Sequence, residues 1–438
     1  MKGQENDQGL TDSDISIGWV LGVGFLLLFL CSPNLNTPNG DTLGWVKYID
    51  AFASDKVVIL THNYGTAEST EIEISRNQID FWAYFNPHHL LYLPVTSVAY
   101  YFAREIFPDL QAGAFLRFWN SLFSTGIIVT MFFILRTMFP GSPWVLPWVI
   151  FTGTSVTFFR YATDGSQYMT ALFFLLLASS GVVDFIRTGK PQNLVQTGTS
   201  LAIAALFHQI VAILVPFLLI GACLIASGFK REGKNVSSKW LRSMIAYALG
   251  IPVFVYLVVA YYALSPQDKF TPSGIFYFAT LYARVPDYWN LHILEGLRST
   301  LVASIGFYFG SDRAAFLLFK SVWFTALAMV LPAAWLLGLL STFKLSGTRK
   351  LWLMFCLFWL VPLFIFLCFW NPGHEFYHLF LMPPLMTLAV LGTATTLGAS
   401  RARYVALACF WIWIILAIVL NLPSSLEGSP WRESVWLY

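Results

Sequence analysis

Charged residues are scarce in this chain: Asp, Glu, Lys and Arg together make up 11% of its 438 residues. Soluble proteins carry about 25% of these residues, which cover their surface. Hydrophobic residues instead reach 57%, and the mean hydropathy is +0.64. This composition excludes a soluble enzyme, a disordered chain and a disulfide-rich secreted module. It predicts an all-α membrane protein that crosses the bilayer many times.

Paired cysteines and an excess of basic charge are also lacking. The five cysteines lie in apolar segments without paired spacing, so they predict neither disulfides nor a metal site. The formal net charge of +3 gives no electrostatic basis for a nucleic-acid partner. No internal repeat is visible, so the inverted repeats of many transporters have no support here.

Long apolar runs predict about eleven transmembrane helices. The first run follows a polar segment and lacks the basic start and cleavage site of a signal peptide, so an uncleaved helix is expected. The run 194–229 is counted as two short spans that turn near His208, with one long kinked helix as the alternative. The others lie at roughly 17–31, 115–138, 144–160, 167–187, 241–264, 314–341, 351–370, 376–398 and 403–422.

The segment 89–107 decides the orientation of every later span. If it lies on the outer surface, thirteen Lys and Arg residues fall in inner loops and only Arg160 falls in a short outer connection. Because positive residues collect in short cytoplasmic loops, this arrangement is favoured. The predicted organisation is a cytoplasmic tail over 1–14, a transmembrane module over 15–422 with outer loops at 33–114 and 265–313, and an outer tail over 423–438.

Two interfacial helices are expected in the first outer loop. The first follows Gly40-Asp41-Thr42, and its apolar residues between 45 and 52 share one helical face. Asp41 is a candidate catalytic carboxylate, with helix capping as the competing role. A short strand is expected over 57–60.

The second interfacial helix opens with Asn86-Pro87-His88-His89. Two imidazoles at the start of a helix can bind phosphate or a metal ion, or act as acid and base. Since adjacent residues point to different faces of a helix, only one of the two histidines is expected to face a given site.

Four further polar residues lie in or next to the predicted spans. Arg160 either only extends to the membrane surface or, as favoured for the sole cation of a short outer connection, meets an anionic partner, a lipid headgroup or a substrate phosphate. Asp164 follows in the same outer turn and is either a site carboxylate or a helix cap. His208 is either a site residue or a hydrogen-bonded structural histidine. Lys320 either extends to the membrane surface or contacts a lipid phosphate.

The sequence His374-Glu375-Phe-Tyr-His378 matches the zincin pattern, in which two imidazoles bind zinc and the glutamate activates water. An intramembrane zinc protease is therefore one alternative. No third ligand is evident downstream, and the motif lies in the first turn of a span, near the other polar residues. A metal or phosphate site without proteolysis is favoured, and a divalent metal ion is a candidate cofactor.

In their order along the chain, these elements resemble the GT-C family of membrane glycosyltransferases, which includes protein O-mannosyltransferases and aminoarabinose transferases. The resemblance covers about residues 15–422. The family's His-Pro-Pro element is Asn-Pro-His-His here, so no role is transferred to a single histidine. The matching segments are Gly40-Asp41-Thr42, Asn86 to Pro94, Arg160 to Asp164, and His374-Glu375 ahead of Met382-Pro383-Pro384.

The resemblance implies an enzyme that moves a sugar from a polyprenyl-phosphate carrier to an acceptor hydroxyl, with inversion. The charge distribution predicts that its site lies on the outer face, and the lack of an organelle signal favours the plasma (inner) membrane. Membrane lipids and the lipid-linked donor are its expected partners, and the acceptor is open between protein, lipid and glycan. A non-enzymatic transporter or assembly subunit is the remaining alternative. Such a transfer needs a general base, for which Asp41 is the candidate, and groups that stabilise the leaving phosphate. Asp164 is expected to orient the acceptor or to help hold a divalent ion. The candidates for phosphate contact are Arg160, His88, His89, His208 and Lys320, and the candidates for metal binding are His374, Glu375 and His378.

Overall fold

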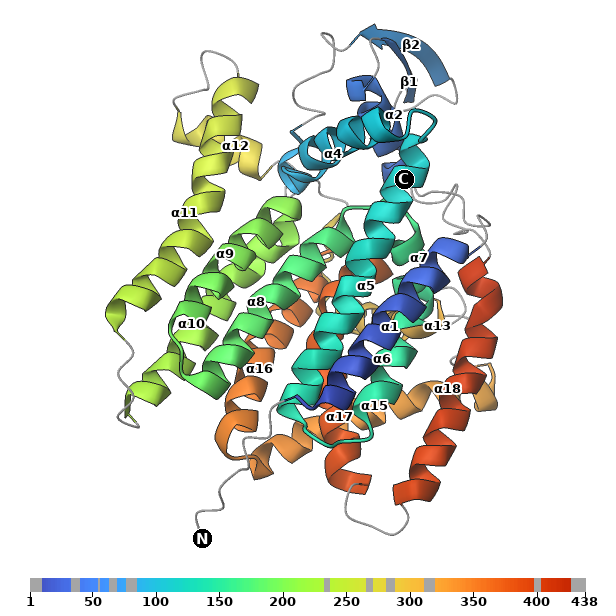
Figure 1. Ribbon diagram of the computed structural model, residues 1–438, viewed down its shortest axis with the longest axis vertical. Coiled ribbons are helices and arrows are strands. Elements are labelled where there is room, and N and C mark those ends of the chain that lie inside the picture. The colour runs from blue at the N-terminus through green and yellow to red at the C-terminus, as the bar shows by residue number, and fades with distance from the viewer. Residues whose placement is uncertain are drawn as a thin grey trace.

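The computed structural model describes residues 10–32, 40–53, 56–62, 69–75, 85–231, 237–264, 271–280, 288–310, 320–397 and 403–426. These residues form a helical bundle that carries two helices and a β-hairpin at one end (Figure 1). The elements are α1 (Asp12–Cys31), α2 (Gly40–Ala53), β1 (Lys56–His62), β2 (Ser69–Ser75), η2 (Pro87–His89), α4 (Tyr92–Ile106), α5 (Ala112–Met138), α6 (Val145–Gly153), α7 (Val156–Thr163), α8 (Tyr168–Thr188), α9 (Gln192–Phe207), α10 (Gln209–Arg231), α11 (Ser238–Ala263), α12 (Pro272–Ala279), α13 (Ile293–Phe309), α15 (Val322–Ser341), η5 (Thr342–Lys344), α16 (Gly347–Phe369), η6 (Glu375–Phe380), α17 (Met382–Leu397) and α18 (Arg403–Leu426).

Eight of the described helices are long and apolar enough to cross a membrane: α1, α5, α8, α10, α11, α15, α16 and α18. The 16-residue α17 is also apolar but shorter. Large apolar side chains point away from the bundle on the outer helices, where Trp19, Phe254 and Trp323 are 72%, 67% and 87% exposed. Such a surface is stable in lipid and would be costly in water.

Two apolar runs are interrupted by breaks in the helix. The division predicted near His208 is confirmed, because α9 ends at Phe207, α10 begins at Gln209, and the residue between them is extended (φ −156°, ψ 124°). The run 144–160, predicted as one span, is broken between α6 and α7. There the hydroxyls of Thr154 and Ser155 bond to backbone carbonyls three or four residues earlier, which competes with helix continuation. The second break leaves α7 as a separate eight-residue helix.

The described part of the loop predicted over 33–114 covers one end of the bundle. α4 lies across this end next to α2 and not within the bundle, as predicted for a segment that does not span (Figure 1). The Tyr100 hydroxyl of α4 donates a 2.9 Å hydrogen bond to Asp50 of α2, which joins the two helices.

The strand expected over 57–60 lies within β1. It pairs antiparallel with β2, from Lys56 opposite Ser75 to His62 opposite Ser69. The sequence of β2, Ser-Thr-Glu-Ile-Glu-Ile-Ser, alternates polar and apolar residues as a strand does, and this signal was missed in the sequence analysis.

The described part of 265–313 is largely helical. α12 lies near the covered end, and α13 packs against α16, α7 and η6. Gly296 allows the close approach to α16, since a Cβ at this position would lie 1.9 Å from the Cys368 carbonyl oxygen. The small buried residues of α13 therefore make this segment part of the bundle.

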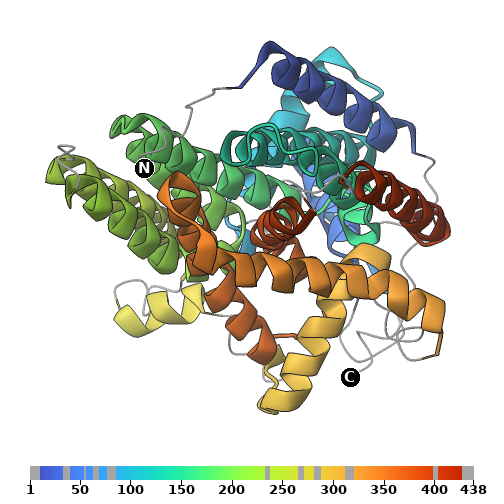
Figure 2. The ribbon, with the colours of Figure 1, turned by 90° about the horizontal axis from the view of Figure 1, so that it is seen from below.

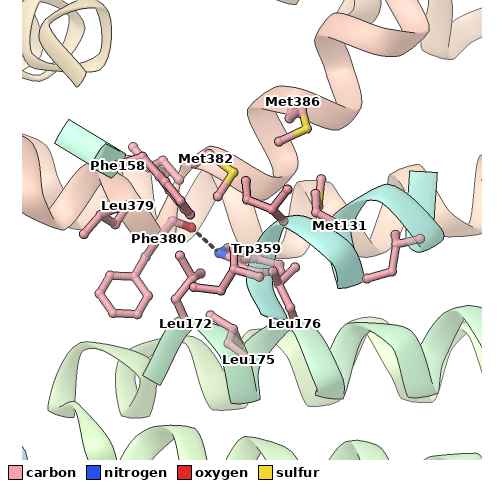
Figure 3. Packing of buried hydrophobic residues seen from close by; sticks show 14 of the residues in the cluster. Met131, Phe158, Leu172, Leu175, Leu176, Trp359, Leu379, Phe380, Met382 and Met386 are labelled. Carbon is pink, nitrogen blue, oxygen red and sulfur yellow. Dashed lines mark hydrogen bonds between the residues drawn. The ribbon is translucent and has the colours of Figure 1, made fainter. Parts of the chain in front are cut away.

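The hydrophobic core supports η6, which carries part of the polar cluster predicted near the C-terminus. The buried indole of Trp359 in α16 donates a 2.7 Å hydrogen bond to the Phe380 carbonyl at the end of η6 (Figure 3). Met131 of α5, Leu172 of α8 and Met382 of α17 pack around this bond. Seen along the bundle in Figure 2, α17 lies among the other helices and α15 runs obliquely across them.

Replacing Gly338 with Ala is expected to destabilise the protein by about 2 kcal/mol. A Cβ at Gly338 of α15 would lie 2.1 Å from the Leu388 carbonyl oxygen of α17, so the two helices would have to separate. Thermal unfolding in detergent measures the effect. Gly250→Ala in α11 is the matched control, because nothing lies within 4 Å of the added Cβ there. Equal unfolding temperatures for both variants would contradict the close packing.

Candidate functional site

Most of the described polar residues predicted to carry function gather at the covered end of the bundle. η2 is tied to the end of α9 by a 3.0 Å hydrogen bond from the Leu91 amide to the Leu206 carbonyl. The Tyr256 hydroxyl of α11 donates a 2.5 Å bond to the Pro87 carbonyl. These bonds hold the two histidines of η2 against the break at His208.

His88, His89 and His208 form a buried cluster. The ring centroids are 4.3 Å apart for His88 and His89, 4.6 Å for His88 and His208, and 4.8 Å for His89 and His208. One ring nitrogen from each histidine lies within 4.8 Å of the others. The prediction that only one of His88 and His89 faces a common site is wrong, since the His208 ring packs against both.

Burial keeps these imidazoles neutral. Desolvation lowers the pKa of His88 to about 4, although a hydrogen bond with Gln209 partly opposes the shift. Desolvation also lowers the pKa of His89 well below its usual range, and repulsion from His88 and His208 adds to this effect.

Lowering the pH is expected to destabilise the protein through this cluster. With a folded pKa of about 4 for His88 and an unfolded value of about 6.5, the unfolded chain takes up the proton first. The stability that neutral His88 contributes to the folded state is therefore complete above about pH 6.5, and it is lost as the pH falls toward 4. The unfolding temperature should drop between pH 7 and pH 5, and should drop less in His88→Asn. The exposed His292→Asn is the control, and an unchanged pH slope in His88→Asn would contradict the prediction.

Arg160 and Glu375 form an ion pair between α7 and η6. The distance from Arg160 Nη1 to Glu375 Oε1 is 3.1 Å, and the two side chains are only 14% and 7% exposed. A pair this buried depends on both partners, because either charge alone would be poorly solvated.

The zincin geometry predicted for His374, Glu375 and His378 is not formed. η6 is a 3₁₀ helix with three residues per turn, so residues four apart do not share a face as they do in an α-helix. Glu375 instead pairs with Arg160. The Nδ1 and Nε2 atoms of His378 each lie 3.1 Å from a backbone carbonyl oxygen, of His374 and Thr300 respectively. Both ring nitrogens of His378 are thus directed at protein oxygens and not at a shared metal position.

Asp164 lies in the turn between α7 and α8. Its Oδ1 accepts a 2.8 Å bond from the Gly165 amide, so it caps this turn, whereas Gln167 occupies the N-cap of α8. Thr42 of α2 packs against the turn, since a Cβ at Gly165 would lie 2.7 Å from Thr42 Cγ2. Asp41 precedes Thr42 in the first turn of α2, which brings its backbone to the Asp164 turn. The Asp41 side chain lies outside the described part of the chain.

Lys320 differs from its predicted position. The predicted run 314–341 would place it two turns inside a helix, but α15 begins at Val322. The Ser321 hydroxyl caps this helix by accepting a 3.3 Å bond from the Phe324 amide. Lys320 is exposed just ahead of that cap, on a helix that packs mainly against α17.

Aromatic rings connect the histidine cluster with the Arg160–Glu375 pair. The Tyr168 ring lies 4.9 Å from His208 and 5.1 Å from Phe376, the residue next to Glu375. Sequence reasoning missed Tyr168 and Phe376, because aromatic residues are common throughout this chain.

The buried link between α2 and α8 was also missed. The Trp45 indole donates a 3.1 Å hydrogen bond to Gln167 Oε1, and the Gln167 side-chain nitrogen lies 2.9 Å from His89 Nε2. The available signal was the position of Trp45, one helical turn after Asp41 on the apolar face predicted for this helix.

Comparisons with known proteins show the fold class. No protein-family model matches the sequence, and no curated protein matches it significantly. The crystal structure of ArnT from Cupriavidus metallidurans bound to undecaprenyl phosphate matches 95% of this chain and 75% of its own, with 12% identity and a TM-score of 0.55. The same ArnT in the apo state matches with 13% identity and a TM-score of 0.49, covering 94% and 76% of the two chains.

A third match is to the S. cerevisiae protein O-mannosyltransferase Pmt1–Pmt2 complex bound to the sugar donor. It has 13% identity and a TM-score of 0.42, and covers 58% of this chain and 34% of that chain. The extended match to ArnT shows that this chain has the GT-C fold predicted from its sequence, over nearly its whole length.

Proposed function

We propose that this protein is a membrane glycosyltransferase that moves a sugar from a polyprenyl-phosphate carrier to an acceptor hydroxyl. The observation that carries the proposal is the convergence of groups at the covered end of the bundle. There the start of α2 with Asp41 meets the Asp164 turn, and the Arg160–Glu375 pair and the histidine cluster lie on adjoining elements. A site at the end of a membrane bundle suits a substrate with a polar head and a lipid tail.

The reaction needs a base and stabilisation of a leaving phosphate. Asp41 would accept the proton of the acceptor hydroxyl as its oxygen attacks the anomeric carbon. The bond from that carbon to the phosphate oxygen breaks on the opposite side, which inverts the configuration. Arg160 would stabilise the charge that develops on the departing lipid phosphate. Asp164 would orient the acceptor.

The predicted topology places this site on the outer face of the plasma membrane. The short inner loops carry nearly all the Lys and Arg residues of short connections, which gives a cytoplasmic N-terminus. α1 begins at the end of the bundle opposite to α2 and α4, consistent with that orientation (Figure 1).

Transfer from a lipid-linked donor tests the proposal directly. The full-length protein would be purified, reconstituted in liposomes and given a panel of undecaprenyl-phosphate hexoses and aminosugars labelled in the sugar. We expect at least one donor to lose its label to an acceptor or to water and to leave undecaprenyl phosphate. If no donor is consumed, the proposal is overturned, whether or not undecaprenyl phosphate binds.

A further inference from the structure

The hydrogen bonds around the histidine cluster determine which ring nitrogen carries the proton. The proton position of His89 depends on Trp45, whose indole N–H can only donate a hydrogen bond. Because it donates to Gln167 Oε1, the Gln167 side chain must direct its NH₂ group at His89 Nε2. Nε2 therefore accepts, and the neutral His89 ring carries its proton on Nδ1.

His208 is fixed by the backbone. The Ile210 amide donates a 3.1 Å hydrogen bond to His208 Nδ1, in the manner of a side chain that caps the start of α10. A backbone amide cannot reverse its role, so Nδ1 must accept. The neutral His208 ring therefore carries its proton on Nε2.

In His88, unlike His208, the proton lies on Nδ1. The Gln209 side-chain NH₂ donates to the Ala279 carbonyl, which turns Gln209 Oε1 toward His88 Nδ1 at 3.3 Å. His88 Nδ1 thus donates, and Nε2 is the acceptor of this ring.

Two of these protons lack an acceptor within the described part of the chain. His89 Nδ1 and His208 Nε2 are both buried, and neither has a hydrogen-bond partner among the described residues. Buried donors of this kind are uncommon, because the hydrogen bonds lost with water are not replaced. They mark a place where a ligand with acceptor atoms can bind.

The surrounding helices favour negative charge at the same place. The 23-residue α10 begins directly after His208, and the 21-residue α8 begins directly after Gln167, the partner of His89. Each helix directs the positive end of its dipole and its first amides toward the cluster. This field attracts an anion and repels a cation.

A metal ion would need the reverse proton positions. To coordinate through Nε2, His208 would carry its proton on Nδ1, where it would face the Ile210 amide. To coordinate through Nδ1, His89 would carry its proton on Nε2, where it would face the Gln167 NH₂ group. The three rings are spaced closely enough for a zinc site, but their hydrogen-bond partners oppose one.

We propose that the His88–His89–His208 cluster is a phosphoryl-oxygen site, in which His89 Nδ1–H and His208 Nε2–H donate to the phosphate of the lipid substrate, and that it holds no metal ion. This inference rests on the proposed function and assigns the donor atoms within it.

Matched variants separate hydrogen-bond donation from metal binding. His89→Asn and His208→Gln place an amide N–H near the original donor, whereas His89→Leu and His208→Leu remove it. All four remove an imidazole and would weaken a zinc site. Binding of undecaprenyl phosphate and of inorganic phosphate would be measured on the full-length protein in nanodiscs, with metal content determined by mass spectrometry. Thermal unfolding would verify that each variant is folded.

We expect the two Leu variants to bind undecaprenyl phosphate about tenfold or more weakly, which corresponds to about 1.4 kcal/mol. The Asn and Gln variants should stay within about threefold of the wild type, and all proteins should be free of stoichiometric metal. If the Leu variants bind only undecaprenyl phosphate more weakly, the site recognises a lipid headgroup. If they bind both undecaprenyl phosphate and inorganic phosphate more weakly, the site recognises phosphate in general.

Two results would overturn the inference: stoichiometric zinc in the wild type that all four variants lose, or equal phosphate binding by the Leu variants and the wild type. The proposed function fails separately if the wild type binds undecaprenyl phosphate in the expected pattern but transfers no sugar from any donor.

Discussion

The variant Asp41→Asn is expected to lose transferase activity by a factor of about 10² to 10⁴, the usual contribution of a general base. The amide has nearly the same shape as the carboxylate but cannot accept the acceptor proton. Donor binding should change little, because the lost group acts on the acceptor. The loss should therefore appear in kcat, measured as release of undecaprenyl phosphate under saturating donor.

Asp50→Asn is the matched control for this experiment. Asp50 lies in the same helix and accepts a hydrogen bond from Tyr100 of α4. Its replacement therefore weakens the contact between α2 and α4 without changing Asp41. We expect a lower unfolding temperature with kcat within about threefold of the wild type. If Asp41→Asn keeps full activity, another group is the base and the role proposed for Asp41 is wrong.

The variant Arg160→Gln is expected to lower kcat/KM by about 10² or more, because it removes the positive charge proposed to face the leaving phosphate. It also leaves Glu375 buried without its counter-charge, so the unfolding temperature should fall as well. The double variant Arg160→Gln with Glu375→Gln removes both charges. It should recover part of the stability and none of the activity.

The single variant Glu375→Gln distinguishes the proposed transferase from the protease alternative. The glutamine carbonyl can still accept a hydrogen bond from the Arg160 guanidinium, so the transferase activity of the variant should fall by only about tenfold. A zinc protease would lose all activity, since this glutamate would activate its water. Complete inactivation of Glu375→Gln together with unaltered activity of Arg160→Gln would contradict the role proposed for Arg160.

The class of protein and the position of many helices follow from the sequence alone. Apolar runs of sufficient length have to form helices in a membrane, because each backbone polar group must be satisfied within its own segment. The same reasoning located the break at His208, where polar residues interrupt an apolar run. The charge distribution also placed 89–107 outside the bundle. Counting this segment as a span would move the Lys and Arg residues of the inner loops to the outer side.

The composition of the site depended on contacts between distant parts of the chain. Arg160 and Glu375 are 215 residues apart, and His88 and Gln209 are 121 apart, so no local pattern could pair them. The zincin pattern does not form a zincin site, because η6 is a 3₁₀ helix and its residues lie on other faces than in an α-helix; η6 packs against Trp359 and α13. Local sequence determined where most of the long helices lie, although it missed the break between α6 and α7 and the start of α15. Only the tertiary structure determined which residues meet, because long-range packing and buried hydrogen bonds select their partners.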